Sequence, residues 1–167
     1  MSADTDPTDS FDAVISAADA PVWIVTTSAH GQRAGCLVGF ATQVSIEPRR
    51  FLVGLSKSNH TYETAKTATH LAVHLIAARH FEVAGLFATT TGDDTDKFAR
   101  CDWHTGPHGL PVLTSAAGWF AGEILERIDL GDHLGVLLAP VAAEAPSTDH
   151  AILHLSAVAE LKPGHPA

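Results

Sequence analysis

The segment SKSNHT, residues 56–61, carries side chains suited to binding a phosphate group. Ser56, Ser58 and Thr61 supply hydroxyl groups, and Lys57 supplies a positive charge. The segment leaves a predicted strand and enters a predicted helix, where free backbone N–H groups and the helix dipole favour an anion. An ordinary helix cap rich in Ser and Thr has the same composition. The segment alone therefore leaves both a phosphate site and a simple cap open.

A second candidate is the stretch AGCLVGFATQVS, residues 34–45, which is interrupted by Gly35 and Gly39. Small residues leave the backbone bare, so a flat ligand could lie against it and bond to its N–H and C=O groups. The same glycines are typical of the corner of a β-barrel, where a strand bends or bulges. Spacing alone does not decide between a ligand-binding strand and a corner.

Two short motifs complete the set of candidates. DKF, residues 96–98, places a lysine beside an aromatic ring in a long polar segment, where the pair could cover a ligand. GDH, residues 131–133, opens directly onto the apolar run LGVLLAPV, so that His133 lies where a predicted strand enters the core. An imidazole titrates near neutral pH and can donate or accept a hydrogen bond. Each motif, taken singly, is also typical of a surface turn.

The sequence gives little support for metal binding, nucleophilic catalysis or a nucleotide-binding motif. The chain has 11 histidines, but it contains no CxxC or HExxH motif. On a predicted strand, His70 and His74 would lie about 13 Å apart, too far for one metal ion. No GxSxG, GxGxxG or Walker sequence is present, and Cys36 lies in an apolar strand, where a thiol usually serves packing. We therefore expect neither a metal site nor a nucleophilic triad, and we expect no dinucleotide site of the GxGxxG type.

The elements that must position these residues are mostly strands. Runs rich in β-branched and aromatic residues between turn residues predict antiparallel strands, and apolar residues at helical spacing predict short helices. The predicted strands are residues 22–27, 33–46 (bent at its glycines), 51–56, 71–76, 118–128 and 133–144, with one or two closing strands within 151–161. The predicted helices are residues 10–19, capped by Ser10, 59–69 and 79–90.

These elements fit one domain, an antiparallel β-barrel with helices on its outside. Residues 1–9 are acidic and small and are predicted to be disordered, which places the domain at residues 10–162. Residues 129–132 are predicted to form a hairpin turn. The polar segment 90–109 is of the kind that is either mobile or functional.

The composition narrows the possible partners. The formal charge is −9, with 19 acidic against 10 basic residues, so free nucleic acid and anionic membranes are not expected to bind. Hydrophobic residues make up 46% of the 167, which indicates a large core or a surface shared with a second subunit. Two cysteines and an acidic start without an apolar stretch indicate a cytoplasmic protein with reduced thiols.

Taken together and in order, the segments resemble the flavin reductase-like family, whose fold is the FMN-binding split barrel. The resemblance runs from about Pro21 to Glu144, and no single segment is decisive. It is carried by PVWIVTT, GQRAGCLVGFATQVSIEP, FLVGLSKSNHTYE, DKF, WHTGPHGLPVL and GDHLGVLLAPV.

The resemblance implies a mainly β protein, an antiparallel split β-barrel with a few short peripheral helices, that forms a homodimer with flavin near the subunit interface. It implies hydride transfer from NADH or NADPH to FMN or FAD, with reduced flavin passing to a partner such as a monooxygenase. His133 would lie near the nicotinamide as the catalytic residue. The implied cofactor-binding residues are Gly35, Cys36, Leu37, Val38, Ala41, Thr42, Ser56, Lys57, Ser58, Thr61, Lys97 and Phe98.

The chain also departs from the family pattern. Members commonly have hydroxyl residues where this chain has Leu37 and Gly39, and the C-terminal stretch 151–167 contains no aromatic residue. The alternative is a split-barrel protein that binds FMN, or a related cofactor such as a deazaflavin or haem, without acting as a reductase. A third reading is a dimeric β-barrel whose apolar strands serve only for association.

Overall fold

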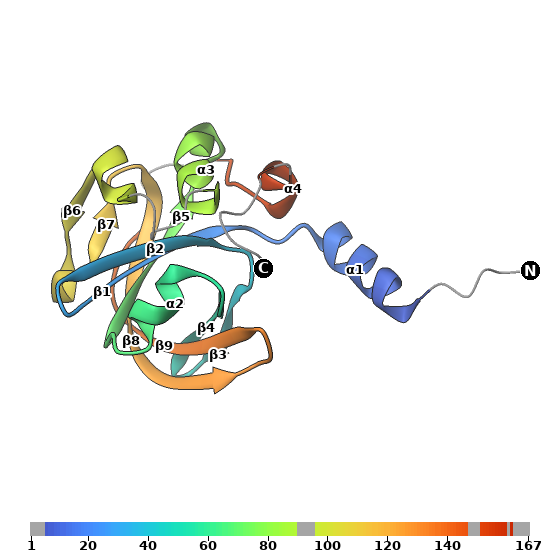
Figure 1. The fold of residues 1–167 in the computed structure, drawn as a ribbon, viewed down its shortest axis with the longest axis horizontal. Helices are drawn as coiled ribbons and strands as arrows, with labels where there is room; N and C mark the ends of the chain where they lie inside the picture. The colour runs from blue at the N-terminus through green and yellow to red at the C-terminus, as the bar shows by residue number, and fades with distance from the viewer. Residues whose placement is uncertain (1–5, 90–95, 147–150, 160, 162–167) are drawn as a thin grey trace, which may run out of the picture.

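The computed structural model describes residues 6–89, 96–146, 151–159 and 161. Strands dominate these residues, and the helices are short (Figure 1). The strands are β1 (Trp23–Ala29), β2 (Gln32–Val38), β3 (Ala41–Ile46), β4 (Arg49–Ser56), β5 (His70–Ile76), β6 (Trp103–Thr105), β7 (Pro111–Leu113), β8 (Ala116–Asp129) and β9 (His133–Glu144). The helices are α1 (Pro7–Ala18), α2 (His60–Ala65), α3 (Phe81–Thr89) and α4 (Leu155–Val158), with 3-10 turns η1 (Ala78–His80), η2 (Lys97–Arg100) and η3 (Pro107–Gly109).

Seven strands form one antiparallel sheet in the order β2-β1-β5-β8-β9-β4-β3. The two edge strands, β2 and β3, are consecutive in the chain and are joined only by Gly39 and Phe40. Since such a link spans at most about 11 Å, the sheet must roll up until its edges meet at this point. Gly54 N–H, on β4, donates to the carbonyl of Phe40 at 2.7 Å and fixes the link. The predicted antiparallel, mainly β fold is confirmed.

The rolled sheet encloses one main core. Buried side chains of β1, β2, β4, β5 and β9 meet there, among them Val25, Val53 and Val136. Helix α2 lies within the curve of the sheet (Figure 1) and adds Ala65 to the same core. A second cluster packs α3 and η2 against the other side of β1, through Phe87 and Phe98. Buried side chains thus pack on both faces of the strands next to the candidate motifs.

The predicted strand 33–46 is wrong as a single element. The structure divides it at Gly39 into β2 and β3, which lie at opposite edges of the sheet. Both halves of the segment have strand-like composition, so the sequence does not show that they lie at opposite edges of the sheet. Gly39 does mark a corner, as one of the two open interpretations held, whereas Gly35 lies within β2.

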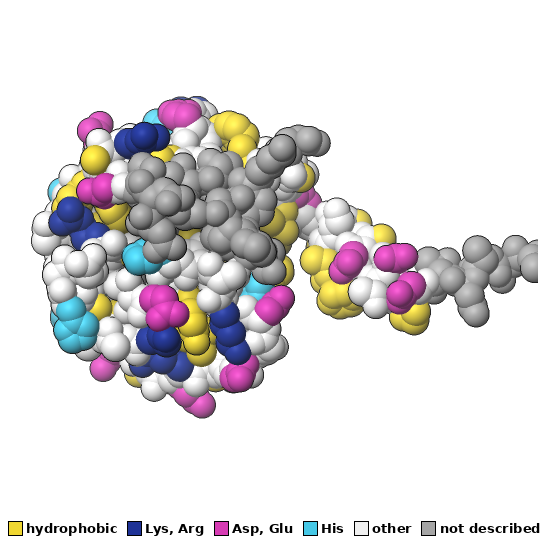
Figure 2. Space-filling view, in the orientation of Figure 1, with side chains coloured by type: hydrophobic (Ala, Val, Ile, Leu, Met, Phe, Trp, Pro, Cys, Tyr) yellow, Lys and Arg dark blue, Asp and Glu magenta, His cyan; other side chains and the backbone are white. Residues whose placement is uncertain are grey.

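The first helix begins earlier than predicted. It starts at Pro7, with Asp6 as its N-cap accepting from Thr8 N–H at 2.9 Å, so the predicted cap at Ser10 is wrong, and the helix includes residues 7–9 of the predicted tail. Proline at the first helical position and an aspartate before it are a strong start signal. The helix extends away from the rolled sheet (Figure 1). Its surface carries apolar and acidic side chains (Figure 2), with Phe11 62% and Val14 67% exposed.

Over residues 151–159, the C-terminal segment does not form the predicted closing strands. These residues make isolated bridges, Pro21 to His154 and Ala77 to Ile152, before the short helix α4. Strands β1 and β5 each already have a partner on both sides, so neither offers a free edge to a further strand. The polar segment, where it is described, forms η2 and the small hairpin β6–β7. Within the residues that the structure describes, none of the helices has the length and apolar character that a bilayer-spanning segment needs.

His74 is a buried connection between three strands. Its Nδ1 lies 2.9 Å from the carbonyl oxygen of Ile24 on β1, and its Nε2 lies 3.1 Å from the backbone nitrogen of Leu113 on β7. A carbonyl only accepts and a backbone N–H only donates, so this ring is neutral with its proton on Nδ1. Burial lowers the pKa of His74 to about 4.

The low pKa of His74 predicts an acid-sensitive fold. In the unfolded chain the ring takes up a proton near pH 6.5, whereas in the folded chain it stays neutral down to about pH 4. The free energy of unfolding should therefore fall between pH 6.5 and 4, by up to about 1.4 kcal/mol per pH unit. Urea unfolding of the wild type and His74→Gln across this range measures the effect. The variant should show a smaller slope, and equal slopes would contradict the assignment.

Candidate functional site

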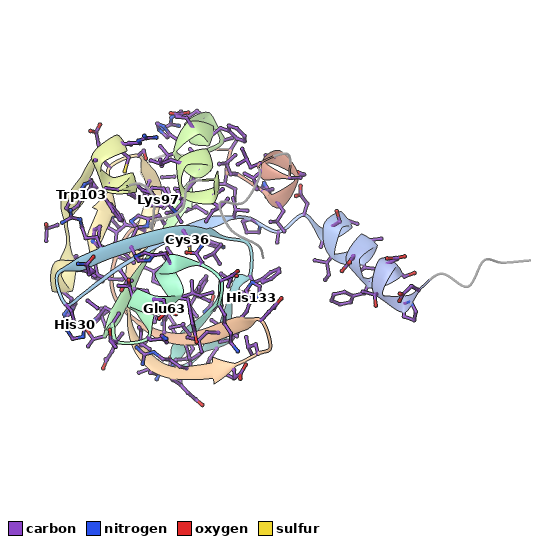
Figure 3. The ribbon with its side chains drawn as sticks, in the orientation of Figure 1. His30, Cys36, Glu63, Lys97, Trp103 and His133 are labelled. Carbon is purple, nitrogen blue, oxygen red and sulfur yellow. The ribbon has the colours of Figure 1, made fainter. Side chains whose placement is uncertain are left out.

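A cavity of about 790 Å³ lies where the rolled sheet closes. It gathers parts of the chain that are far apart in sequence: the end of β2, the end of β4, the start of β9, helix α3 and the C-terminal segment. Figure 3 shows two of the contributors, Cys36 on β2 and His133 at the start of β9. The lining residues are Asp12, Cys36, Leu37, Val38, Gly39, Phe40, Gly54, Ser56, Asn59, Phe87, Ala88, Asp132, His133, Leu155, Val158 and Leu161.

One wall of the cavity is the end of β2, residues 36–40. Because β2 is an edge strand, paired with β1 alone in the described sheet, alternate backbone N–H and C=O groups face away from β1. Burial raises the pKa of the Cys36 thiol, so this side chain is a neutral packing group. The wall therefore offers backbone hydrogen-bonding groups between apolar side chains, which suits the edge of a planar heterocycle.

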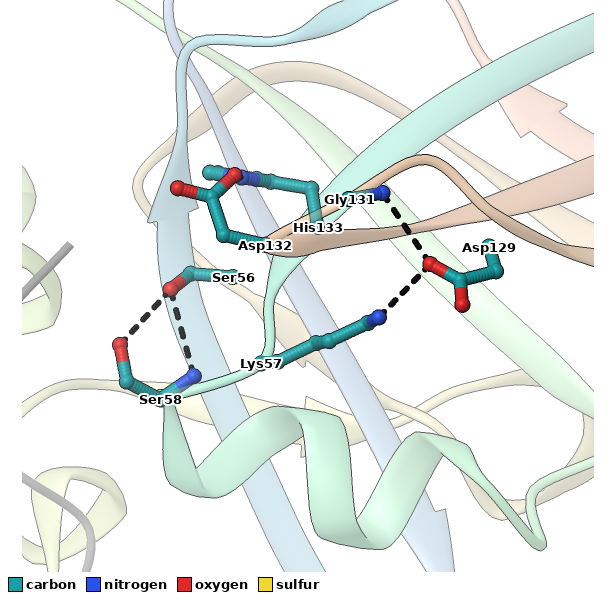
Figure 4. Close-up of polar contacts among 7 residues, drawn as sticks. All are labelled: Ser56, Lys57, Ser58, Asp129, Gly131, Asp132 and His133. Carbon is teal, nitrogen blue, oxygen red and sulfur yellow. Dashed lines mark hydrogen bonds and ion pairs between the residues drawn. The ribbon is translucent and has the colours of Figure 1, made fainter.

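A second wall is polar and comes from the end of β4 and the start of β9. The β4–β9 ladder pairs Ser56 directly with His133, which brings the SKSNHT and GDH motifs together. Ser56 Oγ lies 2.9 Å from Ser58 Oγ (Figure 4), and Asn59 caps α2 by accepting from Thr61 N–H at 2.9 Å. Lys57 N–H donates to the Asp132 carbonyl at 3.0 Å. Hydroxyl and amide groups thus gather at one end of the cavity.

His133 is fixed by its neighbours. Its Nδ1 lies 2.7 Å from Asp132 Oδ1, and its ring lies 4.9 Å from that of Phe40 at 55°. The hydrogen bond from the imidazole lowers the pKa of the Asp132 carboxyl. Since a carboxylate can only accept, Nδ1 carries a proton, and in the neutral form of the ring Nε2 is an acceptor. The imidazole side chain is 19% exposed, so it can meet a ligand in the cavity.

Lys57 is held away from the cavity. Its Nζ lies 2.7 Å from Asp129 Oδ1, which also accepts from Gly131 N–H at 3.1 Å (Figure 4). The hydrogen bond from Lys57 lowers the pKa of Asp129. Lys57 is absent from the described lining of the cavity, which contains two carboxylates and no lysine or arginine. In this arrangement the ammonium group of Lys57 is paired with Asp129, and its phosphate contact stays a prediction.

Four other predicted contacts lie behind the cavity wall. Lys97 is 5% exposed, and its Nζ donates to the carbonyls of Gly35 at 3.0 Å and Phe87 at 3.3 Å. Burial lowers the pKa of this ammonium group. Phe98 packs edge-on against Phe87, and Thr61 is buried at the start of α2. Gly35, Thr61, Lys97 and Phe98 therefore support the wall from behind and do not line it.

Ala41 and Thr42 lie elsewhere. They belong to β3 and line a second cavity of about 640 Å³, together with the aromatic rings of Trp23, Phe51 and Phe120. The predicted flavin-binding stretch is thus divided at the corner, and only its part from Cys36 to Phe40 lines the first cavity.

Sequence reasoning missed the apolar residues that complete the first cavity. Phe87 and Ala88 come from α3, and Leu155, Val158 and Leu161 come from the C-terminal segment. Nothing in their own sequence pattern distinguishes them from ordinary core residues. Asn59 could have been predicted from the sequence, because it lies inside the motif SKSNHT. Among the residues described, no group of three or more His, Cys, Asp or Glu side chains is placed to hold a metal ion.

Comparison with known proteins identifies the family. Residues 15–159 match the family model of the flavin reductase like domain. The chain belongs to the flavin reductase-like family. This match covers most of the predicted domain 10–162 and includes all the cavity walls except Asp12 and Leu161.

Curated relatives are similar over part of their length. The chain is 32% identical over 114 residues to the stachydrine N-demethylase reductase subunit Stc3 of Rhizobium meliloti, covering 66% of this chain and 48% of that protein. It is 32% identical over 133 residues to the FMN reductase (NADH) RutF of Methylorubrum populi, covering 80% of this chain and 65% of that protein. The chain thus spans from about half to about two thirds of the length of these relatives.

Solved structures confirm the fold of the flavin reductase-like family. The flavin reductase domain protein from Arthrobacter sp. FB24 superposes with a TM-score of 0.77 at 23% identity, over 88% of this chain and 94% of that one. The NADH:FAD oxidoreductase SgcE6 of Streptomyces globisporus gives a TM-score of 0.77 at 22% identity, over 92% and 91% of the two chains. At these identities the likeness establishes the fold.

Adding a side chain at Gly35, behind the cavity wall, should destabilise the protein. A Cβ there would lie 2.7 Å from Cε1 of the buried Phe87 and 3.2 Å from Cγ2 of Thr26. We expect Gly35→Ala to lower the free energy of unfolding by about 1–3 kcal/mol.

The matched control is Gly85→Ala in α3, where the nearest atom from elsewhere in the described chain, Leu161 Cδ2, would lie 4.0 Å from the new Cβ. This variant should be neutral or more stable by up to about 1 kcal/mol, because alanine favours a helix. Urea unfolding compares the two variants. Equal stabilities would show that the Gly35 site can expand.

Proposed function

We propose that the protein is an NAD(P)H-dependent flavin reductase, which transfers a hydride from a nicotinamide to FMN or FAD. The observation that carries this proposal is the cavity in which an edge-strand backbone, a serine-rich end and His133 meet. The family membership supports it. So do the names of similar proteins, an FMN reductase (NADH) and an NADH:FAD oxidoreductase.

The cavity fits a flavin in size and in the distribution of its groups. Its volume of about 790 Å³ lies within the range of cofactor sites. Apolar side chains, Leu37 and Phe87 among them, lie on the side of β2 and α3, where the isoalloxazine ring would be held against the backbone of residues 36–40. When bound, the flavin supplies the acceptor for the hydride of the nicotinamide.

The polar end of the cavity would hold the phosphate. Ser56 and Asn59 of the lining would supply neutral donors there, together with Ser58, whose Oγ lies 2.9 Å from Ser56 Oγ. Lys57 is proposed to join them when an anion is present. Its ion pair with Asp129 is exposed to solvent, and such pairs contribute little stability, so a phosphate can compete for the ammonium group. Gly35, Thr61, Lys97 and Phe98 are assigned positioning roles, since they lie behind the wall.

His133 is proposed to meet the nicotinamide. Asp132 holds the imidazole through Nδ1, which leaves Nε2 free to accept a hydrogen bond from the carboxamide of the nicotinamide. Phe40 packs against the same ring and limits its rotation. Orienting two reactants at contact distance is a large part of such catalysis, so this chain contributes chiefly by orientation and by excluding water.

Replacing His133 should slow the chemical step more than it weakens flavin binding. We expect His133→Ala to lower the rate of flavin reduction by NADH by about tenfold or more, as for other lost positioning groups. Anaerobic stopped-flow absorbance near ~450 nm measures reduction, and fluorescence titration measures FMN binding. His30→Ala, at the exposed β1–β2 turn, is the matched control.

An unchanged reduction rate in His133→Ala would remove His133 from the mechanism. If the wild type binds FMN but is bleached by neither NADH nor NADPH at saturation, the reductase role fails. The alternative of a split-barrel protein that only binds its cofactor then holds.

A flavin-dependent monooxygenase is the proposed acceptor of the reduced flavin. The similar chains include the reductase component of the flavin-dependent trigonelline monooxygenase of Acinetobacter baylyi, 27% identical over 67% of this chain and 36% of that protein. Stc3 is likewise named as the reductase subunit of a demethylase. We place the protein in the cytoplasm, where its two free cysteines stay reduced.

We further propose a homodimer. Exposed apolar side chains lie on β3 and β9, the two strands on either side of β4, with Ile46 74%, Val44 49% and Val141 47% exposed. Burying such side chains against a second copy would remove them from water. Sedimentation equilibrium should give twice the chain mass of 17.5 kDa. Ile46→Lys should shift the protein towards the monomer, and a wild type that stays monomeric at all concentrations would refute the dimer.

A further inference from the structure

The C-terminal segment forms a fixed wall of the flavin cavity. We call residues 151–159 the strap. Leu155 and Val158 of the strap, followed by Leu161, line the same cavity as Ser56 and Asn59 of the polar end. The strap closes a site whose other walls come from the sheet and α3, so its side chains decide how much room is left.

The strap is anchored along its length. Leu153 is buried, donates its N–H to Ile76 O at 2.9 Å and accepts from Val22 N–H at 3.1 Å. The Leu155 N–H donates to Ala20 O at 2.9 Å. Asp19, just after α1, accepts from both the N–H and the hydroxyl of Ser156 at 2.8 Å each. These bonds hold the side chain of Leu155 at a defined place.

That place lies directly over Gly39. A Cβ added to Gly39 would lie 2.9 Å from Leu155 Cδ2, closer than real Cβ atoms come to other groups. The glycine at the end of β2 and the leucine of the strap are therefore complementary in shape. Leu155 occupies the space that a side chain at position 39 would take, next to the backbone wall of residues 36–40.

We propose that Leu155 is a ring-binding residue of the cavity, packing an apolar methyl group against the planar tricyclic ring held on residues 36–39. This inference rests on the proposed flavin site and assigns the strap to the ring, as distinct from the phosphate tail. Leu155 adjoins Gly39 on the ring wall, whereas the hydroxyl and amide groups for the tail lie on β4 and the start of α2. An apolar contact of this kind contributes through the area it removes from water.

The proposal predicts that Leu155 acts on the ring whatever tail the ligand carries. Lumiflavin has the isoalloxazine ring without the ribityl phosphate, and FMN has both. Leu155→Ala should raise the dissociation constants of both ligands by a similar factor, about tenfold. Flavin fluorescence titration of the oxidised ligands, without a nicotinamide, measures both. Val14→Ala, on exposed α1, is the control and should change neither.

A double-mutant cycle tests the contact between Gly39 and Leu155. Gly39→Ala leaves every backbone bond of the strap in place but pushes on the far end of the leucine side chain. It should weaken lumiflavin binding in the wild type and have much less effect in the Leu155→Ala background, because the clash is then gone. Additive effects of the two substitutions would overturn the proposal, as would loss of FMN binding with lumiflavin binding unchanged.

Failure of the inference and of the proposed function can be told apart. If the wild type binds neither flavin, the flavin site itself fails and the inference falls with it. If the wild type binds both and Leu155→Ala binds both equally well, only the role of Leu155 is overturned. Far-UV circular dichroism checks that each variant is folded, and Leu155→Met, which keeps the volume, should restore most of the lumiflavin affinity.

Discussion

The two-residue link between the edge strands is the constraint on which the rest of the structure depends. Gly39 and Phe40 are all that separates β2 from β3, so a seven-stranded sheet has to roll until its first and last strands meet. The cavity lies at this meeting point, with β2 as one wall and the end of β4 as another. The same link is in contact with three other parts of the site: Gly54 bonds the Phe40 carbonyl, His133 packs on the Phe40 ring, and Leu155 lies over Gly39.

The two lysines of the site lie at different depths. Lys97 lies behind the cavity wall, where it donates to the carbonyls of Gly35 and Phe87 and keeps two buried acceptors satisfied. Lys57 lies at the surface and is paired with Asp129. The described lining itself carries Asp12 and Asp132 but no cation. A flavin phosphate would therefore be met first by neutral hydroxyl and amide groups, and Lys57 would have to exchange its partner to contribute.

The motifs that carried the family resemblance have unequal roles in the structure. SKSNHT and GDH meet because the β4–β9 ladder pairs Ser56 with His133. DKF supports the cavity from behind, since Lys97 and Phe98 are buried against Gly35 and Phe87. In a family motif, a residue can thus serve the site by holding the wall in place, and sequence spacing does not separate such residues from those that face the ligand.

The sequence by itself determined the antiparallel β class, most strand positions, the family and the segments of the site, because these follow from local composition and from motifs read along the chain. It did not determine that residues 33–46 form two strands on opposite edges, because strand-like composition is the same on both sides of Gly39. Only the tertiary structure decided that Ala41 and Thr42 line the second cavity instead of the first, and that Lys57 pairs with Asp129. It alone brought Leu155 to Gly39, because contacts between residues so distant in the chain depend on how the sheet rolls and leave no local pattern.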